Sequence, residues 1–204
     1  MKALFPALIF LFTFLLTGCS QDRSAELRNL HATVFNQSRP LADFSLRDHN
    51  EKPFSLENLK GKWSILFFGY TNCPDVCPNT LTIMNVVSKQ LPADKVQYVF
   101  VSVDPYRDKL DTLAKYVPYF NPNFIGVTET QAGEVGKLTK QLGILSMPVA
   151  NNSAAGKDNY LVEHSANLIL INPQGNWHGV MSTPHEPAKI VKEFNLIREI
   201  HNES

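Results

Sequence analysis

The sequence predicts an α/β protein built around a central sheet of mostly parallel strands. Two apolar runs, Ile65–Phe68 and Val96–Val103, have the composition of buried strands. Each run precedes a segment whose apolar residues recur at helical spacing, and a shorter strand near Phe124–Val127 repeats the pattern. Strands that alternate with helices in this way form parallel sheets.

The first 19 residues are predicted to be a lipoprotein signal peptide. The apolar stretch from Ala3 to Leu16 is shorter than the roughly 20 residues of a spanning helix. It leads into Leu-Thr-Gly-Cys, which resembles the lipobox of bacterial lipoproteins and implies cleavage before Cys19 and lipid attachment to that residue. An uncleaved N-terminal anchor is the alternative. Either arrangement tethers the domain to a membrane of the bacterial cell envelope, in the periplasm or otherwise outside the cytoplasm, and leaves open which membrane is used.

Residues 20–39 are polar and predicted to be a spacer, so the folded domain is expected to span residues 40–204. The alternating pattern of Pro40–Leu59 predicts a β-hairpin at the edge or end of the sheet. The strand at Ile65–Phe68 follows, and then a helix that we expect to begin at Pro78.

The second half of the chain completes the sheet. Asp104-Pro105 is expected to start the helix that follows the strand Val96–Val103, with Asp104 as its N-cap. A further helix is predicted over Thr130–Leu142. Residues 150–159 have the composition of an exposed loop, and Tyr160–Glu163 that of a short extended segment. Two last strands, Leu168–Ile171 and Trp177–Met181, form a predicted hairpin before a helix over Glu186–His201. This order of elements is typical of a thioredoxin-like fold with an N-terminal hairpin and inserted elements.

Composition excludes several classes of function. The 204 residues carry 19 basic and 19 acidic side chains, so nothing favours nucleic acid as a partner. The sequence also lacks a phosphate-binding loop and a dinucleotide-binding glycine pattern.

The chemistry is expected at Cys73 and Cys77. With Cys19 lipidated, these are the two thiols of the folded domain, and they follow a predicted strand at the carboxyl edge of the sheet, where α/β proteins place their sites. Cys77 is expected at the start of a helix, where the helix dipole favours thiolate over thiol. A structural disulfide is the plainer interpretation, but a bridge across so short a loop removes little chain entropy.

A third ligand is available if the segment before Leu168 loops back over this edge, which would bring His164 to the thiols. Two thiolates and one imidazole without a carboxylate suit copper(I), whereas zinc would need a fourth ligand. The cysteine spacing also permits a disulfide when the pair is oxidised, so metal binding and thiol redox chemistry would be coupled.

Four stretches together resemble the SCO/SenC family of copper-binding, thioredoxin-fold proteins that assemble cytochrome c oxidase: FFGYTNCPDVCP, SVDPYRD, NFIGVT and VEHSANLILINPQG. The similarity runs in order from about Ala42 to Ile197. It implies that Cys73, Cys77 and His164 bind copper, as Cu(I), Cu(II) or both, and that Asp104 supports the site or a partner contact. Glu163 stands where the family usually has aspartate.

The resemblance favours a metallochaperone rather than an enzyme. Its expected partners are the copper-accepting subunit of the oxidase, other copper chaperones or thiol reductants, and the membrane. The rival hypothesis is a thiol–disulfide oxidoreductase that acts on the cysteines of the oxidase subunit or in redox defence, and a copper or redox sensor is a third.

The remaining histidines are interpreted as surface residues: His31, His49, His178, His185 and His201. His178 and His185 are considered as weak additional metal contacts.

Overall fold

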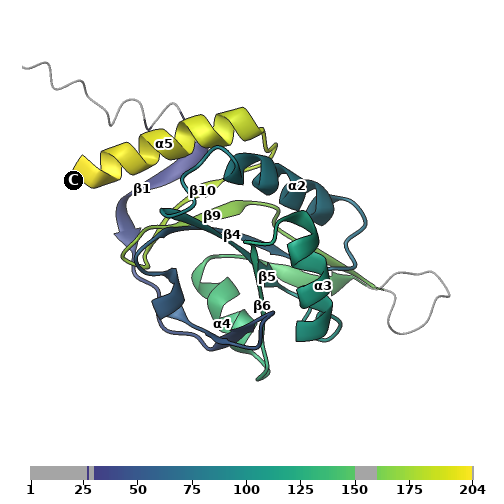
Figure 1. Ribbon diagram of the computed structural model, residues 1–204. Helices are drawn as coiled ribbons and strands as arrows, with labels where there is room; N and C mark the ends of the chain where they lie inside the picture. Colours follow the sequence, from purple (N-terminus) through teal and green to yellow (C-terminus); the bar gives the residue numbers. More distant parts are fainter. Residues whose placement is uncertain (1–26, 28–29, 150–159, 204) are drawn as a thin grey trace, which may run out of the picture.

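The computed structural model describes Leu27, residues 30–149 and residues 160–203 (Figure 1). Its main sheet has eight strands in the order β1-β10-β9-β4-β5-β6-β2-β3, and β7 and β8 form a separate two-stranded ribbon. The strands are β1 (Ala32–Arg39), β2 (Leu46–Asp48), β3 (Pro53–Phe54), β4 (Trp63–Gly69), β5 (Val96–Ser102), β6 (Ile125–Thr128), β7 (Ser146–Val149), β8 (Leu161–His164), β9 (Leu168–Ile171) and β10 (Trp177–Met181). The helices are η1 (Leu56–Leu59), α2 (Val76–Ser88), α3 (Leu110–Phe120), α4 (Glu134–Gln141) and α5 (Pro187–Glu203).

The parallel centre of the sheet is confirmed. β4 pairs with β5 in parallel from Trp63 opposite Val96 to Gly69 opposite Ser102, and β5 pairs in parallel with β6. All seven residues of β4 are buried, as expected for a strand covered on both faces. Because these strands share a direction, the loops that follow β4 and β5 leave the sheet at the same edge.

Antiparallel strands extend the sheet on both sides. β9 pairs with β4, β10 with β9, and β2 with β6, and the predicted hairpins β2–β3 and β9–β10 are both present. The stretch assigned to a spacer differs from expectation, because residues 32–39 form β1 and pair with β10. Its mixed burial is that of an edge strand with one side in solvent, which leaves little apolar alternation to detect in the sequence.

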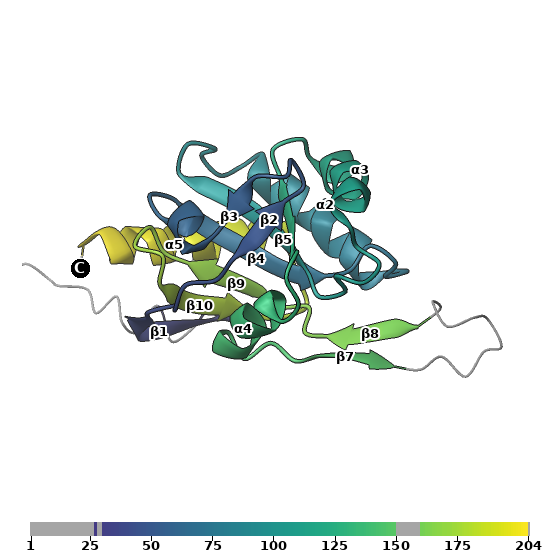
Figure 2. The same ribbon diagram turned by 90° about the horizontal axis from the view of Figure 1, so that it is seen from below.

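Helices cover both faces of the sheet (Figures 1 and 2). On one face, α2, α3 and α5 pack over alternate residues of the central strands, including Phe67, Phe100 and Leu170. On the other, α4 and the β2–β3 hairpin cover Leu66, Phe68 and their neighbours. The cysteine loop lies on the first of these faces, at the edge where β4 ends.

The β7–β8 ribbon projects from the body of the domain (Figure 2). Its strands pair antiparallel, with Ser146 opposite His164 and Val149 opposite Leu161. The predicted extended segment before His164 is therefore a strand, and its partner β7 was not expected. The exposed loop predicted between them, residues 150–159, lies outside the described residues.

Three helices begin elsewhere than predicted. α2 begins at Val76, with Pro78 in its first turn, where the missing N–H is tolerated because the first four N–H groups have no partner within a helix. α3 begins at Leu110 after a separate turn, and α4 at Glu134, after Gly133 at φ 92°. The signal peptide and Cys19 lie outside the described residues, and within the described ones no helix has the length and hydropathy to cross a membrane.

Candidate metal centre

The two cysteines lie on the loop and helix that follow β4. Cys73 is half-buried and Cys77 fully buried, and both are free thiols. The backbone N–H of Cys77, in the first turn of α2, donates a hydrogen bond to Sγ of Cys73 at 3.3 Å. The helix start is therefore directed at the sulfur of Cys73.

The last residue of β4 sets the position of the Cys77 sulfur. A Cβ atom at Gly69 would lie 3.0 Å from Sγ of Cys77 and 2.8 Å from Cε2 of Phe100, both closer than ordinary contact. A side chain at this position would occupy space that the sulfur and the phenyl ring already fill.

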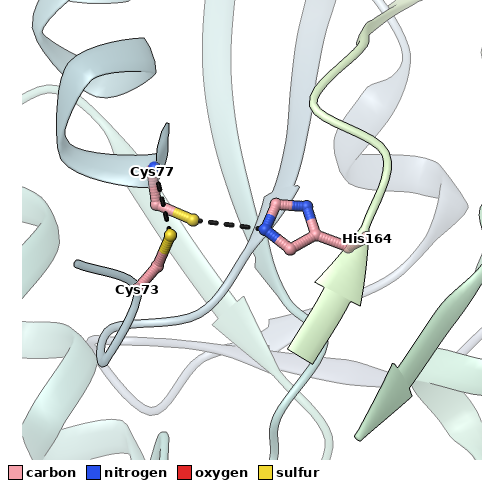
Figure 3. Close-up of side chains that lie close together, drawn as sticks. All are labelled: Cys73, Cys77 and His164. Atoms are coloured by element: carbon pink, nitrogen blue, oxygen red, sulfur yellow. Dashed lines mark hydrogen bonds between the residues drawn. The ribbon is translucent and has the colours of Figure 1, made fainter. Parts of the chain in front are cut away.

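His164 ends β8 and faces the thiols (Figure 3). Its Nε2 lies 3.4 Å from Sγ of Cys77. Its Nδ1 lies 3.1 Å from the carbonyl oxygen of Ser165, which can only accept, so Nδ1 carries the proton and Nε2 is free to bind a metal. The rings of Phe67 and Tyr70 pack edge-on against the imidazole, at centroid distances of 6.1 and 5.7 Å.

The three side chains form one potential metal-binding group. The ligand atoms of Cys73, Cys77 and His164 all lie within 4.8 Å of one another, and no other such group of three occurs in the part of the chain that the structure describes. Two sulfur atoms and one imidazole nitrogen are soft donors, and the group includes no carboxylate. This donor set fits copper(I), which accepts three soft ligands, better than zinc, which would need a fourth.

Burial keeps the side chains of Cys77 and His164 uncharged when no metal is bound. It raises the pKa of the Cys77 thiol well above its ordinary value, although the backbone of Tyr70 opposes the rise. The expectation that the helix start would favour a Cys77 thiolate is therefore wrong, because desolvation outweighs the dipole. Burial also lowers the pKa of His164. A metal ion at Cys77 would have to displace the thiol proton, so binding would release a proton.

Asp104 differs from its predicted local role. Lys109 precedes α3 as its N-cap, and the buried carboxylate of Asp104 instead accepts a hydrogen bond from the hydroxyl of Tyr160 at 2.6 Å and pairs with Arg107. Asp104 also lies five residues before that N-cap, too early in the chain to cap α3.

Asp108 was not singled out from the sequence. This fully buried carboxylate accepts hydrogen bonds from the N–H and hydroxyl of Thr71, at 3.0 and 2.6 Å, and from the hydroxyl of Ser102 at 2.7 Å. It therefore joins the start of the cysteine loop to the end of β5. A second aspartate four residues after Asp104 is the only sequence signal of this role.

An open cleft of about 680 Å³ adjoins the metal-binding group, and its wall includes both Cys73 and His164. Exposed apolar side chains line it, among them Leu145 at 81% and Met147 at 64% exposure. Asp75 and Glu163 are its charged residues. Copper could therefore reach the half-buried ligands from solvent or from a docked protein.

Two of the histidines interpreted as surface residues, His178 and His185, are mostly buried and do not belong to the metal-binding group. His178 is 8% exposed and packs against Trp63, with Nδ1 2.7 Å from the hydroxyl of Ser38. Nε2 of His185 donates to the carbonyl of Ala166 at 2.7 Å. Neither belongs to a group of three potential metal ligands within the described residues.

Comparison with known proteins gives consistent matches over most of the chain. The SCO1/SenC family model matches residues 35–198. A Stutzerimonas stutzeri protein, named as a candidate copper-binding protein, is 37% identical over 87% of this chain and 86% of its own length. Protein SCO2 of Saccharomyces cerevisiae mitochondria is 39% identical over 66% of this chain and 44% of its own length.

Solved structures agree with the fold. The structure of Arabidopsis thaliana ScoI with copper bound matches 79% of this chain and 98% of its own, with 30% identity and a TM-score of 0.70. Bradyrhizobium japonicum ScoI with copper bound matches 77% of this chain and 97% of its own, with 31% identity and a TM-score of 0.67. The thioredoxin-like fold expected from the order of elements is confirmed by these matches.

Proposed function

Because the chain belongs to the SCO1/SenC family, we propose that it is a membrane-tethered copper chaperone that holds its cargo through Cys73, Cys77 and His164. The observation that carries this proposal is the convergence of two sulfur atoms and one imidazole nitrogen within 4.8 Å, beside an open cleft. Solved relatives from Arabidopsis and Bradyrhizobium bind copper on the same fold, which supports the choice of metal.

We further propose that the copper acceptor is the dinuclear copper site of a cytochrome c oxidase subunit, as the family resemblance implies. Cys77 is enclosed, whereas Cys73 and His164 are partly exposed at the cleft. An acceptor thiolate or imidazole that enters the cleft can therefore replace these two ligands first, and Cys77 would be protonated as copper leaves.

Anaerobic titration with copper(I) against a chromogenic chelator tests the metal site in the full-length protein held in detergent. The wild type should retain one tightly bound equivalent with its thiols reduced. Cys77→Ser and His164→Ala should lose that tight binding, whereas His31→Ala, which removes an exposed histidine, should keep it. Equal copper retention in all four proteins would refute the proposal.

The membrane tether is part of the proposal and rests on the Leu-Thr-Gly-Cys sequence. If Cys19 carries lipid, mass spectrometry of the wild type should find an acylated N-terminal cysteine, and Cys19→Ala should move the protein to the soluble fraction unless the leader stays as an anchor. An unmodified Cys19 in membrane-bound protein would favour the uncleaved anchor.

Thiol–disulfide exchange with the oxidase subunit is the second candidate function. It is favoured by the two free thiols, whose sulfur atoms lie within 4.8 Å and are linked through the Cys77 N–H. His164→Ala separates the two functions, because a reductase should keep its disulfide exchange in this variant while a chaperone loses its copper.

A further inference from the structure

We propose that Arg107 and Tyr160 are positioning residues that hold β8, and with it His164, against the cysteine loop. The inference rests on the proposed function, because His164 matters only if it is a ligand. Neither residue reaches the metal-binding group itself, so both would act through the strand that carries the histidine.

The topology of the sheet explains why β8 needs positioning contacts. The cysteines follow β4, in the middle of the main sheet, whereas His164 belongs to the β7–β8 ribbon, which is not hydrogen-bonded to that sheet. The ladder that fixes β4 relative to β5 and β9 therefore does not fix β8. The buried Val162 side chain packs on the core, which is not directional, and the Val162 backbone N–H bonds the Tyr70 hydroxyl, so the middle of β8 is held while its start needs contacts of its own.

Tyr160 lies directly before β8, and both its backbone carbonyl and its side-chain hydroxyl are hydrogen-bonded. Its backbone carbonyl accepts a hydrogen bond from Nη1 of Arg107 at 2.9 Å, and its hydroxyl donates to Oδ1 of Asp104 at 2.6 Å. The guanidinium carbon of Arg107 lies 3.7 Å from the centroid of the Tyr160 ring, so the cation also covers the ring face between these two contacts.

Asp104 and Arg107, which bind Tyr160, are themselves linked to the main sheet. Asp104 and Arg107 form an ion pair with side chains only 3% and 10% exposed, and the Asp104 N–H donates to the hydroxyl of Ser102, the last residue of β5. The same guanidinium lies 5.6 Å from the ring of Tyr70, which starts the cysteine loop and packs edge-on against His164. One cation thus contacts both the segment before the thiols and the segment before the histidine.

These contacts require arginine rather than a positive charge alone. The guanidinium is a planar fork that can bond a carboxylate and a carbonyl while it stacks on a ring, whereas a lysine ammonium cannot make all three contacts. Groups that orient a metal ligand without touching the metal typically change its affinity 10- to 100-fold.

The test compares Arg107→Lys and Tyr160→Phe with two matched controls. Arg39→Lys removes another stacked guanidinium, 4.3 Å from the Phe35 ring, at the far end of the sheet. Tyr98→Phe removes another buried tyrosine hydroxyl, which lacks a hydrogen-bond partner within the described structure. Copper(I) affinity of the full-length protein should fall by roughly tenfold in the first two variants and stay near wild type in the controls.

A double-mutant cycle separates positioning from general damage to the fold. If Arg107 acts through His164, Arg107→Lys should weaken copper binding in the wild type but add almost nothing in a His164→Ala background. The same fold-loss in both backgrounds would overturn the proposal.

Hydrogen exchange gives a readout without copper. In the metal-free protein, Arg107→Lys and Tyr160→Phe should speed amide exchange in β8 while leaving β9 unchanged, and the controls should alter neither. Unchanged exchange in β8 would overturn the inference even if copper binding were weakened. Conversely, a wild type that binds no copper would refute the proposed function, while the exchange data would still decide whether Arg107 holds β8.

Discussion

The glycine that ends β4 provides the space that the Cys77 sulfur occupies, so one added methyl group tests how the metal centre is built. In Gly69→Ala, the new Cβ would lie 2.8 Å from Cε2 of Phe100 and 3.0 Å from Sγ of Cys77, whereas ordinary contact begins at 3.4 Å. The phenyl ring must therefore retreat by about 0.6 Å and the sulfur by about 0.4 Å, because the interior is close-packed and offers no free volume to absorb the methyl group.

This displacement is expected to lower both the stability of the fold and its affinity for copper. Overpacking a buried site costs about 1–3 kcal/mol, so the free energy of unfolding should fall by that amount. A metal site tolerates errors of only about 0.2 Å in its ligand distances. If copper has to draw the sulfur back to its native position, the same strain opposes binding and weakens it by about 5- to 150-fold.

Gly126→Ala is the matched control, since its Cβ would lie 2.7 Å from Cγ2 of Val117 in the core beneath β6. Urea unfolding should show similar losses of stability in the two variants, and competition titration should show weaker copper(I) binding only in Gly69→Ala. If both variants are equally destabilised and bind copper equally well, then Gly69 does not set the position of the thiol.

Three further predictions concern ionisation and access. Burial lowers the pKa of His178 to about 4 from 6.5, so the unfolded chain binds the extra proton between these values. The contribution of His178 to stability should therefore fall by about 3 kcal/mol from pH 7 to pH 4, and His178→Gln should make the decline in urea unfolding less steep. Burial raises the pKa of Asp108 above 3.8, so its contribution to stability is full below that pH and declines as the pH rises through the folded pKa; urea unfolding of Asp108→Asn should lack this decline. Iodoacetamide should label Cys73 in Cys77→Ala at least roughly tenfold faster than Cys77 in Cys73→Ala, as followed by mass spectrometry, because burial both shields Cys77 and raises its pKa.

Each of these predictions has an outcome that contradicts it. An unchanged pH profile in His178→Gln would assign the acid sensitivity to other histidines, and an unchanged profile in Asp108→Asn would show that its carboxyl titrates alike in the folded and unfolded chains. Equal labelling rates would mean that Cys77 becomes exposed faster than it reacts.

The central sheet and the thiol pair could be predicted from sequence because their signals are local. A charge-free apolar run identifies β4, helical spacing identifies α2, and the direction of β4 places the cysteines at the carboxyl edge. The approach of His164 could not be derived this way, since it depends on pairing between β8 and the four-residue strand β7, which contains a proline and has no usable period.

The supporting contacts escaped prediction for a related reason. Arg107 and Tyr160 are 53 residues apart, and nothing in either local sequence reveals that one donates to the carbonyl of the other. The protonation of Cys77 was misjudged because two effects compete. A helix start contributes about 0.3–1 kcal/mol, and the loss of hydration on full burial exceeds it.

The direction of β1 limits how far the metal-binding group can lie from the proposed lipid anchor. Ala32, where this strand begins, lies opposite Met181, which in turn lies opposite Leu168 and so beside Phe67 near the end of β4. The chain therefore enters the sheet at the end that carries the thiols, three strands and roughly 15 Å away. Leu27 already packs against the core, so if Cys19 is the lipid anchor, the eight residues from it to Leu27 span at most about 28 Å. Under the proposed function, copper would then be delivered only to acceptors held at or close above the same membrane.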